Sequence, residues 1–325
     1  MWILGSLKRD LSIFHLSGIF SLLFYLIFKD NLLFIVIWSF IFFQIVDVGH
    51  NYITFWRTLF KKGDKSDSNF YWLIFIGSFL LISIWLLLGI PYYWTFALYF
   101  IVWHHIRQLY GINRWYQRLN NRFCKFSNYF LYLLTFGPFL TFHFRRFPAN
   151  PDLNRQLFTY QNETIFNLSV ILCFLILIFW ILHEIKLYLN GIHELNRFLS
   201  LAVPISLHFY CFLFSKTYLS IFFPLLTLHG LSYMAIMGKS LNILNPKKSL
   251  RFFMGLVCFS LIVFGVCDYL YDDLVIKKLM LNGYPKNYLF TLLIALTGTA
   301  SLFHCIADGF LWTRNNTEAK KIIKT

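Results

Sequence analysis

Long apolar runs recur along this chain and limit its fold more than any other feature. The run IFNLSVILCFLILIFWILHEI at residues 165–185 is typical. A helix needs about 20 such residues to cross the hydrocarbon core of a bilayer. Of the 325 residues, 58 % are hydrophobic and 13 % are charged, which leaves too little polar surface to cover a water-soluble globule. The sequence therefore predicts an all-α fold, a polytopic membrane helix bundle that forms one integral membrane domain over residues 1–325.

The spacing of the runs predicts about ten transmembrane helices joined by short links. Most of the 29 lysines and arginines gather at alternate ends of these helices, so the positive-inside rule places both termini in the cytoplasm. This placement accounts for the net charge of +15 without a basic patch for nucleic acid. We expect a multi-pass protein, in the cytoplasmic membrane if the chain is bacterial. The predicted spans are 11–28, 32–56, 70–90, 92–113, 126–144, 165–185, 197–214, 217–238, 250–268 and 287–311.

Polar side chains form stripes on four of these spans. Spacings of three or four residues place polar side chains on one face of a helix. On the second span and just beyond it, one face carries Asp47, His50, Asn51, Thr54 and Thr58. On the fourth span, one face carries His104, Arg107, Gln108 and Gly111, and His105 is turned about 100° away from it.

The eighth and tenth spans repeat the pattern. His229 and Tyr233 are one turn apart, and Ser301, His304 and Asp308 share a face. All four spans are predicted to run from outside to inside. Counted from the first basic residue at each inner end, the histidines lie about 5–15 Å below the cytoplasmic surface. Imidazoles from four helices are therefore expected at one level of the membrane.

An ionisable group in the hydrocarbon costs about 2.5–3.5 kcal/mol on insertion scales, so such groups face the interior of a bundle and bind one another. Neutral histidine is the commonest metal ligand, and a carboxylate beside it often fixes the ring. The predicted metal ligands are His50, His104, His105, His229 and His304. Asp47, Asp308 and Tyr233 are the candidate catalytic residues, and Arg107, Gln108 and Asn51 are the candidate cofactor-binding residues.

A histidine-rich site with carboxylates suits iron, as a single or di-iron centre, or zinc. Within a leaflet, an open iron site would act on a lipid or isoprenoid substrate. The expected function is therefore a desaturase, hydroxylase or cleavage oxygenase, with an electron-donor protein as a further partner. The HxxxH and HxxHH boxes of the membrane fatty-acid desaturases are absent, because WHHIRQ at residues 103–108 has no third histidine upstream.

Three other classes use the same residues. A b-type cytochrome would bind haem between His50 and His229. A proton-coupled transporter would use the histidines and aspartates as a relay. A lipid transferase would use His229 or His304 as a general base. Its phosphate head group would be held by Arg57, Arg107 and Arg114. His15, His143 and His208 have no comparable acidic neighbours and are expected to be packing residues.

Overall fold

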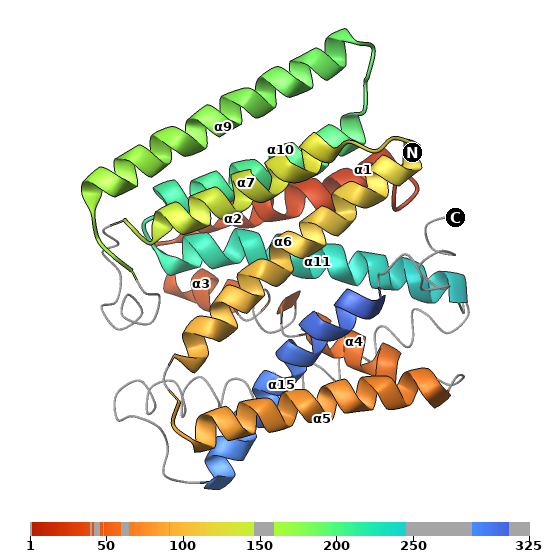
Figure 1. The fold of residues 1–325 in the computed structure, drawn as a ribbon, viewed down its shortest axis with the longest axis vertical. Coiled ribbons are helices and arrows are strands. Elements are labelled where there is room, and N and C mark those ends of the chain that lie inside the picture. Colours follow the sequence, from red (N-terminus) through yellow and green to blue (C-terminus); the bar gives the residue numbers. More distant parts are fainter. Residues whose placement is uncertain are drawn as a thin grey trace. The chain divides into compact units, whose positions relative to one another are not determined.

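A computed structural model describes residues 2–39, 41, 46–47, 49–59, 65–90, 92–145, 159–244 and 288–311. All regular elements within these ranges are helical, which confirms the all-α prediction (Figure 1). The predicted span 250–268 lies outside the described residues. The elements are α1 (Leu7–Asp10), the π-helical η1 (Leu11–His15), α2 (Leu16–Phe28), α3 (Leu32–Ser39), α4 (Gly49–Leu59), α5 (Lys65–Leu87), α6 (Tyr93–Leu119), α7 (Lys125–Phe142), α9 (Glu163–Leu189), α10 (Leu195–Phe209), the π-helical η3 (Tyr210–Phe214), α11 (Tyr218–Leu244) and α15 (Tyr288–Leu311).

Among the described residues, five helical segments are long and apolar enough to cross a membrane. Their outward surfaces are apolar, as contact with lipid requires. On α9, for example, the side chains of Leu168, Phe179 and Leu182 are all more than half exposed. These features support a membrane protein. The five segments are Leu7–Phe28, Ser68–Leu87, Glu163–Leu189, Leu195–Phe214 and Tyr218–Lys239.

Several predicted spans have different bounds in the structure. Within 32–56, the described α-helices are α3, which ends at Ser39, and α4, which begins at Gly49, and the described residues 41, 46 and 47 between them are π-helical. The span predicted at 92–113 continues as α6 to Leu119. At 1.5 Å per residue, the 27 residues of α6 extend for about 40 Å, which exceeds the hydrocarbon thickness. The helix α6 is thus long enough for its basic C-terminal turns to reach the polar head-group layer.

The chain forms two compact packing units. The first comprises Met1–Val36 and Val102–Ser232, and the second comprises Ile37–Ile101 and Tyr233–Thr325. Three helices, α3, α6 and α11, each contribute residues to both units. That the whole chain is one integral membrane domain stays a prediction.

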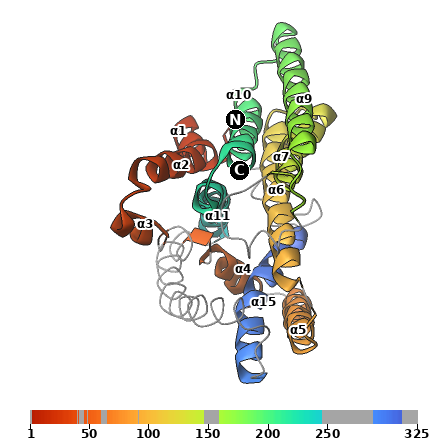
Figure 2. The same ribbon diagram turned by 90° about the vertical axis from the view of Figure 1, so that its left-hand side faces the viewer.

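In the first unit, α7 packs against both α9 and α10 (Figures 1 and 2). A buried ion pair ties these helices together. The Arg197 guanidinium of α10 donates hydrogen bonds to both carboxylate oxygens of Glu184 on α9, at 2.8 and 2.6 Å. It also donates one to the Ser127 hydroxyl of α7 at 2.8 Å. Because the charges pair with each other and the donors are satisfied, the helices can bury them.

Gly18 allows α2 to approach α10 and α11 closely. A Cβ atom at this position would lie 2.6 Å from Leu207 Cδ1 and 2.8 Å from the Pro224 carbonyl oxygen. Any larger residue would push the helices apart. Small residues at contact points are how membrane helices achieve such close packing.

In the second unit, α15 packs along α5 and against α4 (Figure 1). Near one end of α15, Phe303, Ala307 and Leu311 form a buried cluster with Leu59 of α4 and Tyr71 of α5. A second cluster joins Ala295 of α15 to Ile82, Leu86 and Tyr93. Apolar packing at both clusters fixes α15 in register against its neighbours, and His304 lies beside the first of them.

Candidate metal-binding residues

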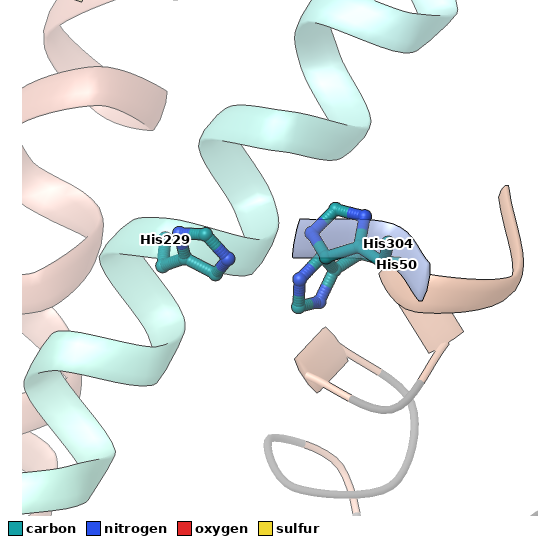
Figure 3. A group of neighbouring side chains, drawn as sticks. All are labelled: His50, His229 and His304. Atoms are coloured by element: carbon teal, nitrogen blue, oxygen red, sulfur yellow. The ribbon is translucent and has the colours of Figure 1, made fainter. Parts of the chain in front are cut away.

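His50 of α4 and His304 of α15 face each other inside the second unit (Figure 3). Their ring centroids are 4.7 Å apart and the rings are nearly perpendicular, at 85°. Both side chains are buried, with exposed fractions of 2 % and 0 %. His229, the third side chain drawn, is carried by the part of α11 that belongs to the first unit.

The hydrogen bond of His50 determines its tautomer. Its Nδ1 lies 3.1 Å from the carbonyl oxygen of Val46. A carbonyl oxygen can only accept, so Nδ1 carries the proton and the lone pair of a neutral ring resides on Nε2. The backbone thereby holds the ring in the form that a metal ligand needs.

The tautomer of His304 follows from a chain of hydroxyl groups. Tyr233 Oη donates to Asp308 Oδ1 at 3.0 Å. Because that phenol has a single proton, it accepts the hydrogen bond from the Thr54 hydroxyl. The Thr54 oxygen in turn lies 2.8 Å from His304 Nδ1 and accepts a hydrogen bond from its N–H. The lone pair of His304 therefore also resides on Nε2.

A carboxylate lies beside each ring. Asp308 Oδ2 is 3.8 Å from His304 Nε2, and Asp308 is 9 % exposed. Asp47 Oδ1 is 3.8 Å from His50 Nδ1, and Asp47 is 25 % exposed. Both distances exceed a hydrogen bond, so each carboxylate neighbours its ring without a direct bond to it. The second unit thus contains two imidazole lone pairs and a largely buried carboxylate on α4 and α15.

Asn51 links these two helices. Its side-chain amide donates to the Ser301 hydroxyl of α15 at 3.2 Å. This contact holds α4 against α15 one residue along the chain from His50. A cofactor-binding role for Asn51 stays a prediction.

The remaining predicted ligands, His104, His105 and His229, belong to the first unit. The rings of His105 and His229 are stacked, with centroids 3.9 Å apart and an interplanar angle of 24°. The ring of His104 lies edge-on to that of His229, at 5.0 Å. Gln108 donates to the His229 carbonyl oxygen at 2.9 Å, which ties α6 to α11. The rings of His104 and His105 thus both contact the ring of His229. Their spacing in the sequence predicted that the two side chains would point to different faces of the helix.

Arg107 is directed toward aromatic residues. It donates to the Tyr132 hydroxyl of α7 at 2.7 Å, and its guanidinium carbon lies 5.0 Å from the Tyr110 ring centroid. Its side chain is exposed. The side chain of Arg57 lies outside the described residues.

Sequence reasoning did not identify Thr54 as a site residue, although it placed Thr54 on the stripe of α4. Its hydroxyl is the link between Tyr233 and His304. The signal was its spacing of four residues from His50 on the same face.

No family model, curated protein or solved structure matches this chain.

Proposed function

We propose that the protein is a multi-pass membrane enzyme that binds iron and oxidises a lipid or isoprenoid. The observation that carries the proposal is the pair of buried histidines, His50 and His304, whose Nδ1 atoms are both held by hydrogen bonds. Asp308, 3.8 Å from His304 Nε2, lies beside the pair as a supporting carboxylate. Histidine ligands with a carboxylate nearby suit iron, and two protein ligands leave coordination positions open.

The residues around the pair suit this role. Bound iron would supply oxygen activation, and zinc is the alternative metal for the same donors. The chain from His304 through Thr54 and Tyr233 to Asp308 would keep the ring oriented and its Nε2 basic. His104, His105 and His229 stay predicted ligands, and an apolar substrate would reach such a site from the membrane without entering water.

Elemental analysis of the detergent-purified protein, together with a visible spectrum, tests the proposal. The wild type should contain stoichiometric iron and no haem absorbance band. His50→Ala and His304→Ala should each remove the metal and the activity. His143→Ala and His193→Ala are the matched controls and should retain both. Stoichiometric metal in both His50→Ala and His304→Ala would refute the proposal.

A metal-free wild type would favour a lipid transferase. The lone pair on His304 Nε2 supports this second candidate, since a neutral imidazole held by a carboxylate-terminated chain can act as a general base. In that case Thr54→Val would reduce turnover of a lipid donor, because the ring would lose its orienting hydrogen bond. Purified protein with two strong haem bands would favour the cytochrome.

A further inference from the structure

A groove between α7 and α9 lies entirely within the first unit. It has a volume of about 590 Å³. Phe126, Phe130 and Leu133 form one wall, and Ile176 and Phe179 form the other. These positions recur every three or four residues on each helix, so each helix presents a continuous apolar face. Because the walls are apolar, a hydrocarbon chain is the ligand that fits them best.

The length of the groove matches one leaflet of a bilayer. Its lining on α9 and on the C-cap residue of that helix runs from Ile176 to Asn190. At 1.5 Å per residue this distance is about 21 Å. Half of a bilayer, head groups included, measures about 20–22 Å. The groove thus has the reach of one lipid molecule, from the membrane midplane to the head-group layer.

The polar lining residues all lie at the Asn190 end of the groove. Lys186 is exposed there, and His183 lies beside it with its Nε2 3.6 Å from Cys124 Sγ. The nearby carboxylate of Glu184 does not neutralise Lys186, because it is buried and paired with Arg197. The mouth of the groove therefore keeps a positive charge, and basic pockets between membrane helices bind anionic head groups.

We propose that the groove binds an anionic glycerophospholipid, with one acyl chain between α7 and α9 and the phosphate at Lys186. The predicted topology places the Lys186 end at the cytoplasmic leaflet, where anionic lipids are concentrated. This site is independent of the histidine centre, so its failure would leave the iron proposal standing and the reverse is also true.

Photo-crosslinking of the full chain in phosphatidylcholine nanodiscs tests the site. The probe is phosphatidylglycerol with a diazirine on one acyl chain. We expect crosslinked peptides from residues 126–133 and 176–187, and competition by unlabelled phosphatidylglycerol but not by phosphatidylcholine. Equal competition by both lipids would overturn the head-group assignment. Labelling confined to other peptides, with none at 126–133 and 176–187, would overturn the proposal.

Two variants separate the head group from the acyl chain. Lys186→Gln should weaken phosphatidylglycerol labelling about fivefold, because one basic residue near the surface contributes about that factor. Lys8→Gln, at an exposed lysine on α1, is the matched control and should label as the wild type does. Ile176→Trp should abolish labelling by filling the groove, with an unchanged melting temperature showing that the fold is intact. Wild-type labelling of Lys186→Gln would overturn the proposal.

Discussion

Asp308 accepts the hydrogen bond of Tyr233 and lies beside the Nε2 atom of His304. Asp308→Asn keeps an oxygen for Tyr233 but removes the charge. We expect metal affinity to fall about 10–100-fold, as it does when a carboxylate that supports a histidine ligand is lost. Competition with a chelator measures the metal affinity of the variant and of the wild type. Asp30→Asn, at an exposed residue after α2, is the control, and equal affinity of the two variants would make Asp308 a packing residue.

His15 and His208 are both buried histidines in the first unit, and they differ in one respect. Neither ring nitrogen of His15 has a hydrogen-bond partner among the described residues. The Nδ1 of His208 lies 2.7 Å from the Pro204 carbonyl oxygen. A buried unsatisfied polar group costs about 1–3 kcal/mol. The ring of His15 is also stacked on Tyr116, with centroids 6.0 Å apart, and a phenyl ring can keep that contact.

His15→Phe should therefore raise the melting temperature, whereas His208→Phe should lower it, because only the second change breaks a hydrogen bond. Thermal unfolding in detergent, followed by intrinsic fluorescence, compares the two variants. A lower melting temperature for both would mean that the cost of the larger phenyl ring exceeds the gain from removing the unsatisfied imidazole at position 15.

At this scale the sequence predicted contacts within one helix in detail, and between helices it predicted only that histidines lie at one level of the membrane. The spacing of four residues predicted that His304 and Asp308 share a face, and their side chains lie 3.8 Å apart. The hydrogen bond between Thr54 and Tyr233 joins residues that are 179 positions apart. It depends on the rotation of α4 and α11 about their axes, which no local pattern specifies.

Among the elements, α2 depends on a single glycine for its packing. Gly18→Ala would place a Cβ atom 2.6 Å from Leu207, closer than real Cβ contacts, so α2 would have to move. We expect a destabilisation of about 1–3 kcal/mol, the typical cost of overpacking. Gly77→Ala is the control, because a Cβ at Gly77 on α5 would meet nothing within 4 Å.

The two glycine variants can be compared by melting temperature and by elution volume in detergent. Gly18→Ala should melt at a lower temperature than Gly77→Ala. Equal melting temperatures would mean that α10 and α11 adjust to the added methyl group without loss.

Helices were easier to predict than their ends. The apolar run 32–56 gave no signal that α3 would end at Ser39, since the residues that follow, FIFFQIV, are as apolar as those before them. Hydropathy detects membrane depth and not helical continuity, so a change of backbone geometry within an apolar run escapes it. By contrast, α9 differs from its prediction by only a few residues, because Asn162 caps it and Gly191 follows it at a positive φ of 77°.

For the whole molecule, the distribution of basic residues predicts that both termini are cytoplasmic. Reporter domains that are active only in the cytoplasm should be active when fused to either end, and a reporter that needs an oxidising compartment should be inactive at both. A fusion at residue 160, between α7 and α9, should give the opposite result. Activity of the oxidising reporter at either terminus would contradict the predicted topology.

Because α3, α6 and α11 each contribute residues to both packing units, every boundary between the units falls inside a helix. Fragments made by cutting after residue 101 or 232 would each end inside a helix, with backbone carbonyls or amides left unsatisfied in lipid. A cut between Asn190 and Gly191 leaves all three of these helices whole. We expect coexpressed halves divided there to reassemble, and we do not expect this of halves divided after residue 101 or 232.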